Sequence, residues 1–334
     1  MNAPVAWPTG RTVRDVSIPV TGVRPEDLEL HRRELTGYCY RMLGSGFEAD
    51  DAVQETMMRA WRAGDDFEGR SSLRSWLYRI ATNVCLDMLR GSQRRARPMD
   101  LGPAGSADSF HGLTRAEHAW VTPVADSRVL AHEDDPAEVA ASRDSVRLAF
   151  VAALQHLPAR QRAVLILREV LRWQATEVAE LLGTTVASVN SALQRARATL
   201  ASRDLSRSDP IDAGQRALLA AYVDAFERYD VSRLVTLLHD DVVMSMPPYD
   251  FWLRGPGQVA DWLLGTGSGC RGSRLVATAA NGCAAFGSYR VDPAGGHLPW
   301  ALQVLEVSGG TITGYHHFLD TERLFPAFGL PARL

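Results

Sequence analysis

Residues 71–90 read SSLRSWLYRIATNVCLDMLR and contain the signals of an amphipathic helix. Ser71 and Ser72 are suitable helix N-caps, because a serine hydroxyl accepts a hydrogen bond from a backbone N–H that the first turn leaves unpaired. Apolar residues then recur at intervals of three or four, the spacing of one buried helix face. That face comprises Leu73, Leu77, Ile80, Val84 and Met88. The stretch therefore predicts an amphipathic helix that packs on one side.

The opposite side of this helix is rich in arginine, and three more arginines follow it at positions 94, 95 and 97. Arginine side chains pair with phosphate groups, and aromatic rings stack on unpaired bases. Trp76 and Tyr78 are therefore candidate stacking platforms, although each ring has packing in a core as its alternative. The candidates for contact with DNA are Arg74, Trp76, Tyr78, Arg79, Asn83, Arg90 and Arg94.

Two further helices are expected before this one. The first follows Pro25 and ends near Gly44, since glycine takes the left-handed conformation that closes a helix. The second lies in EADDAVQETMMRAWR, residues 48–62, and its predicted buried stripe is Val53, Met57, Ala60 and Trp61. Another face of this helix mixes acids with a thioether, which is common on surfaces that dock on a protein and also on ordinary solvated surfaces.

The two segments, in this order, resemble domain two of the extracytoplasmic-function (ECF) sigma factors of bacterial RNA polymerase. In that family the first segment binds the clamp helices of the polymerase, and the second melts the minus-ten promoter element and captures a flipped base. The resemblance assigns the candidate DNA contacts above to the minus-ten element. It implies that the polymerase-binding residues are Asp51, Gln54, Glu55 and Met58.

Residues 176–200, TEVAELLGTTVASVNSALQRARATL, hold a second pattern. Ala179, Gly183 and Val189 have the spacing of a helix-turn-helix. In that motif a small residue lets two helices cross closely, a glycine makes the turn, and an apolar residue buries the second helix. The stretch resembles domain four of the same sigma family, in the same order and at the same distance downstream.

This second resemblance implies that a helix over residues 185–200 enters the major groove at a minus-thirty-five element. Asparagine and glutamine side chains suit adenine, and arginine suits guanine or phosphate. The candidate contacts are Ser188, Asn190, Ser191, Gln194, Arg195 and Arg197.

The charge of the chain changes sign along its length. Its 36 basic residues are all arginine and stand against 39 acids, which gives a net charge of −3. Residues 70–97 carry seven arginines and one acid, and residues 141–203 carry nine arginines and four acids. Residues 99–140, between them, carry two arginines and eight acids. Two basic blocks on an acidic tether fit two contacts with nucleic acid, although an arginine-rich chain also forms local clusters by chance.

The absence of lysine excludes several classes of chemistry. A Walker phosphate loop and a pyridoxal Schiff base both require lysine, and arginine does not accept a proton near neutral pH. The four cysteines form no CxxC pair, so we expect a reduced cytoplasmic protein with no metal ion and no cofactor. Residues 1–24 read as a flexible tail and not as a secretion signal, and no apolar run approaches the ~18 residues of a membrane span.

Residues 211–334 are expected to form a third domain. Helical patterns come first, and one of them covers VSRLVTLLHDD at residues 231–241. A strand, a short helix over residues 255–264 and four alternating segments follow, which predicts a curved antiparallel sheet in an α+β arrangement. This order resembles the SnoaL-like polyketide cyclase domain, a cone of the nuclear-transport-factor-two superfamily.

Cones of this superfamily usually enclose a cavity, and in their enzymes a carboxylate and a histidine serve as acid and base. Successive residues on a strand point to opposite faces, so only one of His316 and His317 faces a cavity, and the sequence leaves open which one. Because many members are not enzymes, we expect a small-molecule ligand at most and no catalysis. Asp241 and Phe286 are further candidates near the proposed pocket. The candidate pocket residues are Tyr249, Asp250, Trp252, Trp262 and His316.

The acidic linker contains HAWVTPVADSRVL at residues 118–130. Its Trp-x-x-Pro resembles a linker motif of sigma factors that carry an extra C-terminal domain, and burial against another domain is the expected use of such a tryptophan. The chain also ends in an apolar segment, DTERLFPAFGLP, at residues 320–331. The expected regulatory contacts between domains are Trp120, Pro123, Leu324, Phe325 and Phe328.

The sequence thus predicts a multi-domain protein with two all-α sigma domains and a C-terminal α+β cone-like domain. Its expected parts are the tail 1–24, sigma domain two 25–97, the acidic linker 98–137, sigma domain four 138–203 and the SnoaL-like domain 211–334. We expect a sigma factor that binds the clamp and flap regions of core RNA polymerase and promoter DNA. The C-terminal domain would replace a separate anti-sigma factor.

Two alternatives remain open at this point. A helix-turn-helix regulator with a ligand-binding domain would explain residues 138–334 but not the block before the linker. A SnoaL-like enzyme with a regulatory DNA-binding half would make the C-terminal domain the active part.

Overall fold

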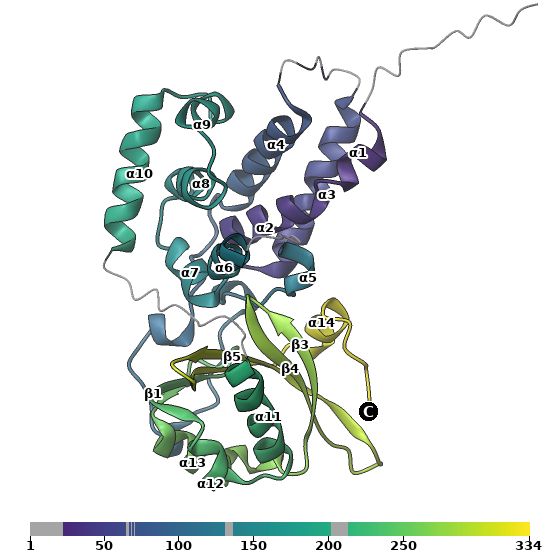
Figure 1. The fold of residues 1–334 in the computed structure, drawn as a ribbon, viewed down its shortest axis with the longest axis vertical. Coiled ribbons are helices and arrows are strands. Elements are labelled where there is room, and N and C mark those ends of the chain that lie inside the picture. The colour runs from purple at the N-terminus through teal and green to yellow at the C-terminus, as the bar shows by residue number, and fades with distance from the viewer. Residues whose placement is uncertain (1–22, 65–66, 68, 70, 131–135, 202–212) are drawn as a thin grey trace, which may run out of the picture.

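A computed structural model describes residues 23–334, apart from 65–66, 68, 70, 131–135 and 202–212. Two helical domains lie together, and a C-terminal domain built on one sheet lies beneath them (Figure 1). All but the last two residues of the expected tail 1–24 fall outside the described residues. In the described parts of the chain, no helix combines the length and the apolar character that crossing a membrane requires.

Four helices lie in the described part of the first helical domain, and two of their ends confirm signals in the sequence. The hydroxyl of Ser72 accepts a hydrogen bond from the backbone N–H of Ser75 at 3.1 Å and caps the predicted helix. Gly44 ends an earlier helix with a left-handed φ of 74°. The helices are α1 (Pro25–Glu29), α2 (Arg32–Leu43), α3 (Gly46–Arg62) and α4 (Leu73–Met88).

One member of the predicted buried stripe of α3 is wrong. Trp61 is 65% exposed, whereas Val53, Met57 and Ala60 are buried as predicted. Each helical residue is rotated by about 100° from the one before it, so Trp61 turns away from the side on which Ala60 packs. The exposed ring lies in the last turn of the helix.

The second helical domain confirms the helix-turn-helix. Gly183 has a φ of 61° in the turn, and Ala179 and Val189 are buried on the two helices that it joins. The helix before the helix-turn-helix, α8, continues into a short π-helical segment, labelled η5. The elements are α6 (Pro136–Asp144), α7 (Leu148–Leu154), α8 (Ala159–Leu165), η5 (Ile166–Val170), α9 (Ala175–Leu181) and α10 (Val186–Leu200).

The C-terminal domain holds a six-stranded sheet with the order β2–β1–β6–β5–β4–β3. Helices α11 (Ala213–Glu227), α12 (Val231–Val235) and α13 (Pro256–Leu264) lie on one side of the sheet, and α14 (Thr321–Ala327) lies on the other (Figure 1). The strands are β1 (Leu238–Ser245), β2 (Trp252–Arg254), β3 (Arg274–Ala280), β4 (Cys283–Val291), β5 (His297–Ser308) and β6 (Thr311–Phe318).

Two details of this domain differ from the sequence prediction. Strands β1 and β6 are parallel, whereas an antiparallel sheet was expected. No hairpin turn joins these two strands, so no turn fixes their relative direction. The helix predicted over residues 231–241 ends at Val235, and Asp241 belongs to strand β1.

The two faces of the sheet have different partners. The inner face packs with α11, α12 and α13 into one core, to which Tyr222, Phe286 and Tyr315 belong. The outer face contributes Val304 and Phe318 to a second apolar cluster, which continues through both helical domains. The C-terminal domain therefore docks on the helical domains through the outer face of its sheet, and we call this arrangement the docked state.

The turn between β3 and β4 reaches into the junction of all the other parts. Asn281 at its tip is fully buried and has a φ of 56°. Its backbone N–H donates to Val124 O at 3.1 Å, and its Oδ1 accepts from the Val124 N–H at 3.0 Å. Its Nδ2 donates to the Tyr40 hydroxyl at 2.6 Å and to Val146 O at 2.7 Å. One side chain thus joins α2, the linker and the start of the second helical domain.

We expect a methyl group at Gly282 to break this junction. Gly282 has a φ of 72°, and an added Cβ would lie 2.9 Å from Cβ and O of Arg143. Gly282→Ala should therefore separate the C-terminal domain from the helices and raise the radius of gyration measured by small-angle X-ray scattering. Gly310→Ala is the matched control, because Gly310 has a φ of 76° and nothing within 4 Å of an added Cβ. Equal expansion of both variants would contradict the assignment.

Candidate polymerase and promoter interfaces

The predicted polymerase-binding residues share one side of α3. Asp51, Gln54 and Met58 are exposed, and Glu55 is half-buried beside Arg59, whose Nε donates to Glu55 Oε1 at 2.6 Å. The exposed Trp61 extends this surface by a further helical turn. Acids next to a thioether and an indole form a face on which both charge and apolar contact are available to a protein partner.

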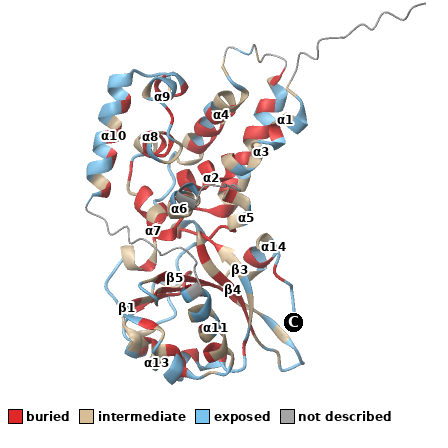
Figure 2. Ribbon diagram, in the orientation of Figure 1, coloured by how far each residue is buried: buried red, intermediate tan, exposed pale blue. Residues whose placement is uncertain are grey.

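The predicted minus-thirty-five contacts all lie on the open side of α10 (Figure 2). Thr185 caps this helix, because its hydroxyl oxygen accepts a hydrogen bond from the Ser188 N–H at 3.1 Å. Arg197 is paired with Glu169 at 2.6 Å, whereas Arg195 extends from the exposed face. The structure thus places Ser188, Asn190, Ser191, Gln194, Arg195 and Arg197 on the surface.

The predicted minus-ten surface on α4 is partly covered. Trp173, which precedes α9, lies with its ring 5.0 Å from the ring of Tyr78. The Arg74 guanidinium lies 5.1 Å from the Tyr78 ring and 5.3 Å from the Trp173 ring, and its Nε donates to Glu34 at 2.7 Å. Tyr78 is fully buried, so its ring is covered in this arrangement, and its role as a stacking platform stays a prediction.

The other predicted minus-ten residues lie along the rest of α4 and just beyond it. Trp76 is half-buried against Phe67, with 4.9 Å between the rings. Arg79 lies 3.8 Å from Glu180 on α9 of the second helical domain. The residues that remain exposed toward the end of α4 and after it are Asn83, Arg90 and Arg94.

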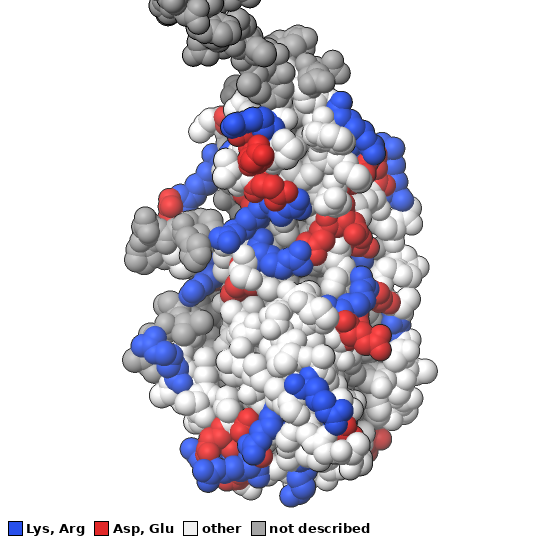
Figure 3. Space-filling model, turned by 90° about the vertical axis from the view of Figure 1, so that its right-hand side faces the viewer, with Lys and Arg blue, Asp and Glu red and all other residues white. Residues whose placement is uncertain are grey.

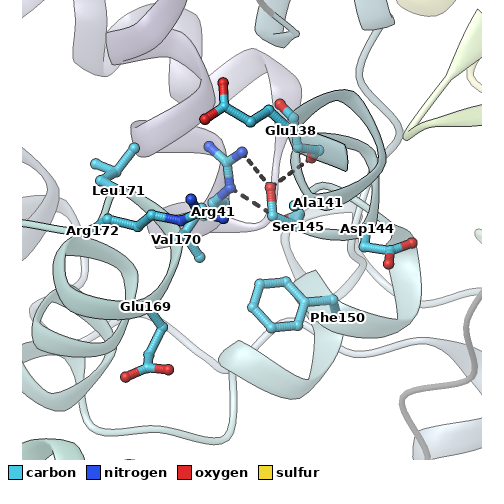
Figure 4. A pocket seen from close by; sticks show the side chains of 11 residues that line it. Arg41, Glu138, Ala141, Asp144, Ser145, Phe150, Glu169, Val170, Leu171 and Arg172 are labelled. Carbon is cyan, nitrogen blue, oxygen red and sulfur yellow. Dashed lines mark hydrogen bonds between the residues drawn. The ribbon is translucent and has the colours of Figure 1, made fainter. Parts of the chain in front are cut away.

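Sequence reasoning missed the residues that hold the two helical domains together. Trp173 lies in the connection before the helix-turn-helix, outside every predicted apolar stripe. A tryptophan in a short connection between helices is the sequence signal that could have identified it as a contact residue. Arg41 is buried on α2 and donates to Ser145 O at 3.1 Å and to Ser145 Oγ at 2.6 Å. A cavity of about 510 Å³ opens beside this pair, between the two domains (Figure 4). Burial lowers the pKa of Arg41 to about 10.

A second buried arginine crosses the same seam from the other side. Arg162 on α8 donates to Met42 O, to Gln155 Oε1 at 2.6 Å and to Leu157 O at 3.2 Å. Burial lowers the pKa of Arg162 to about 10 as well. The seam between the helical domains is therefore lined with hydrogen-bonded charge and is not only apolar.

The structure does not assemble the predicted pocket of the C-terminal domain. His316 faces outward from the sheet and bonds to Ser245 Oγ through its Nδ1 at 2.8 Å. Its Nε2 lies 3.9 Å from Glu306, which also lies 3.7 Å from Arg147. Burial alone would raise the pKa of Glu306, but His316 and Arg147 lower it to about 2. The histidine that faces inward is His317, whose ring lies 4.3 Å from that of Tyr315.

The other predicted pocket residues are covered by the linker. Asp250 accepts from Arg115 Nε at 2.8 Å, whereas His316 bonds to Ser245. Trp252 Nε1 donates to Gly102 O at 2.9 Å. The linker ring of Phe110 lies 5.0 Å from the rings of both Tyr249 and Trp262. Phe286 packs in the inner core.

The predicted contacts between domains fall into two groups. Trp120 is 2% exposed, and it lines a cavity together with Pro123 and Leu324. Phe325 instead packs on Tyr289 of its own sheet, with 5.1 Å between the rings. Phe328 lies half-buried against the shared apolar cluster.

Charge is distributed unevenly over the molecule. On the side shown in Figure 3, arginines and acids gather over the helical half, and the middle of the C-terminal half is largely uncharged. Within the described residues, no three His, Cys, Asp or Glu side chains form a group that would hold a metal ion.

Three family models match the chain in this order: Sigma-70 region 2 at residues 28–95, Sigma-70 region 4 at 147–200 and a SnoaL-like domain at 219–315. The ECF RNA polymerase sigma factor SigG of Mycobacterium tuberculosis is 44% identical over 316 residues, which cover 92% of this chain and 83% of SigG. The chain belongs to the ECF sigma factors. It is a sigma factor of the kind that directs transcription initiation by binding core RNA polymerase and promoter DNA.

Solved structures extend this comparison to the fold. The crystal structure of the ECF sigma factor SigJ of Mycobacterium tuberculosis covers 92% of this chain and all of SigJ, with a TM-score of 0.60 and 21% identity. RpoE of Bartonella quintana, solved in complex with the anti-sigma factor NepR, covers 52% of this chain at 24% identity, with a TM-score of 0.35. The expectation that this sigma factor has no separate anti-sigma factor stays a prediction.

Arg195 provides a direct test of the α10 surface. If its guanidinium reads a base, Arg195→Ala should weaken promoter binding by about 1–3 kcal/mol, because a bidentate contact to a base edge is lost. Binding of the holoenzyme to promoter fragments measures this, and Arg228→Ala, on the exposed surface of the C-terminal domain, is the control. Unchanged affinity and selectivity in Arg195→Ala would count against the groove assignment.

Proposed function

We propose that the C-terminal domain of this ECF sigma factor restrains transcription in cis. The observation that carries this proposal is the cover of Trp173 over Tyr78 and Arg74, together with the bonds of Asn281 to both helical domains. In the docked state, part of the minus-ten surface is buried while α10 and the polymerase-binding side of α3 stay open. In this state the protein would bind polymerase and the minus-thirty-five element, but it would not capture a flipped base.

The polymerase and promoter contacts follow from the exposed surfaces. Asp51, Gln54, Glu55 and Met58 would contact the clamp helices, and the open residues of α10 would contact the major groove. On α4, Asn83 and Arg90 would meet the duplex first, since they are exposed in the docked state. Arg74 and Tyr78 would follow once Trp173 moves away, because stacking on an extruded base needs an accessible ring.

The C-terminal domain contacts both helical domains, so it can control the movement of Trp173 away from Tyr78. Its outer sheet face shares an apolar cluster with both helical domains, and Glu306 lies 3.7 Å from Arg147 at the start of α7. Its hairpin tip bonds to α2, the linker and the second helical domain at once. A separate anti-sigma factor would act on the same surfaces from outside, so we propose that the fused domain takes its place.

A small-molecule ligand of the cone is also proposed, while catalysis is not. The interior holds two buried nitrogen atoms without a hydrogen-bond partner among the described residues, Gln303 Nε2 and His317 Nε2. Buried polar groups usually find partners, so these atoms would accommodate a polar group of a ligand. Asp250 is paired with Arg115, and His316 with Ser245 and Glu306, so no acid–base pair of these two residues supports an enzymatic role.

Removal of the covering ring should raise transcription. Trp173→Ala frees Tyr78 and Arg74 and should increase promoter melting and transcript yield from purified core polymerase. Trp300→Ala is the control, because Trp300 lies on β5 and stacks with Arg290, away from the seam. Equal or lower yield from a folded Trp173→Ala protein would refute the restraint by this ring.

A chain that ends near Asp209 tests the whole C-terminal domain in the same assay. It should keep core polymerase binding and produce more transcript than the full chain. Loss of polymerase binding would instead mean that the C-terminal domain contributes to the polymerase-binding surface.

The docked state should weaken as pH rises. The Asp126 carboxylate accepts from the Gly282 N–H at 2.8 Å, and burial raises its pKa from 3.8 to about 6, against the opposing effects of that hydrogen bond and of Arg143. A raised pKa stabilises the docked state at low pH, and this stabilisation is lost as pH rises from 3.8 to about 6.

Asp126→Asn should remove this dependence. The amide keeps an oxygen for the Gly282 N–H and does not ionise, so above the raised pKa the variant should be more stable than the natural chain by up to about 3 kcal/mol. Thermal unfolding across this pH range measures the difference, with Asp261→Asn on exposed α13 as the control. Parallel pH profiles for the natural chain and Asp126→Asn would contradict the role of this carboxyl.

A further inference from the structure

A cavity of about 470 Å³ lies where the first helical domain, the linker and the C-terminal domain meet. Phe47 of α3 forms one wall, Trp120 and Pro123 of the linker form a second, and Tyr249, Phe318 and Leu324 of the C-terminal domain form the third. It is distinct from the interior of the cone, because Phe318 belongs to the outer face of the sheet. Small-molecule sites prefer such positions between domains, and this volume falls within their usual range.

The walls favour a flat apolar ligand. Trp120, Phe318 and Leu324 are all buried, and the indole, phenyl and pyrrolidine rings that line the cavity present planar or rigid surfaces. Planar aromatic molecules pack well on such surfaces, through offset stacking or edge contacts. Rigid walls also bind with little loss of conformational entropy.

The rim decides the charge of the ligand. Two carboxylates, Glu117 and Asp320, line the cavity. One guanidinium, Arg323, contacts Glu117 Oε1 directly and lies 3.9 Å from Asp320, and it also stands 3.9 Å over the ring of Phe47. Two negative groups against one positive group leave one negative charge beside the aromatic walls. A cation is attracted by this charge and by the ring faces that Arg323 leaves uncovered, whereas an anion is repelled.

We propose that this cavity is a binding site for a planar aromatic cation. Because its walls come from three parts of the chain, the site is complete only in the docked state. A ligand that binds one of two states shifts the population toward that state, so the cation stabilises the docked state. The consequence for transcription rests on the proposed restraint in cis, but binding itself does not.

The test uses berberine, a planar aromatic cation whose fluorescence rises in apolar surroundings, and the full chain without polymerase. We expect saturable binding that Leu319→Trp weakens by about tenfold or more, because a larger side chain at the half-buried Leu319 fills the cavity. Leu264→Trp is the matched control, since Leu264 is 63% exposed on α13. No saturable binding, or equal binding by both variants, would overturn the proposal.

A second pair of variants tests the rim without filling the cavity. Glu117→Gln removes one of the lining carboxylates and should weaken berberine binding severalfold, whereas Glu322→Gln, on exposed α14 but outside the lining, should not. The anion 1-anilinonaphthalene-8-sulfonate should bind more weakly than berberine to the natural chain. Equal or tighter binding of the anion would refute the charge assignment.

A third measurement separates the site from the proposed function. Gly282→Ala, which undocks the C-terminal domain, should lose berberine binding together with its compact shape. If berberine binds as expected but leaves transcription unchanged, the site stands and the restraint in cis is wrong. Undiminished berberine binding by an expanded Gly282→Ala protein would show that the site does not need the docked state, and would overturn this inference.

Discussion

The hydrogen bonds of Asn281 are the constraint on which the arrangement of this sigma factor depends. A buried amide side chain must have its donors and acceptor satisfied, and those partners here come from α2, the linker and the segment before α7. Moving any one of the three parts leaves polar groups unpaired at the centre of the molecule. Asn281 belongs to neither DNA-binding domain, and its bonds add to the direct contacts that Arg41, Arg162 and Trp173 make between them.

The seams around this junction are polar enough to reopen. Arg41 and Arg162 are buried, but the guanidinium of each donates hydrogen bonds to hydroxyl, amide or carbonyl oxygens of the other helical domain or of its own. Such groups are solvated again when the domains part, which lowers the cost of separation compared with an apolar seam of equal area. Trp173 can also move away at low cost, because it covers Tyr78 and Arg74 through non-covalent contacts.

The sequence was sufficient for local structure and for the family, but not for the faces that meet. Ser72, Gly183 and Val189 act on their own helices, and the structure confirms them. Period-two alternation separates His316 from His317 but carries no information on which sheet face is inward. In the same way, helix periodicity identifies one buried stripe. It therefore did not predict that α4 is also buried at Tyr78, or that Trp61 is exposed. Contacts between distant segments decide these residues.

The position of Asn281 along the chain also has a consequence in time. The partners of this residue lie at Tyr40, Val124 and Val146, so more than a hundred residues are synthesised after the last partner before the junction is possible. Domains of a nascent chain generally fold as units from the N-terminus onward. Both DNA-binding domains are thus complete before the residue that joins them to the C-terminal domain has emerged, and each new molecule passes through a period without the docked state before it is finished.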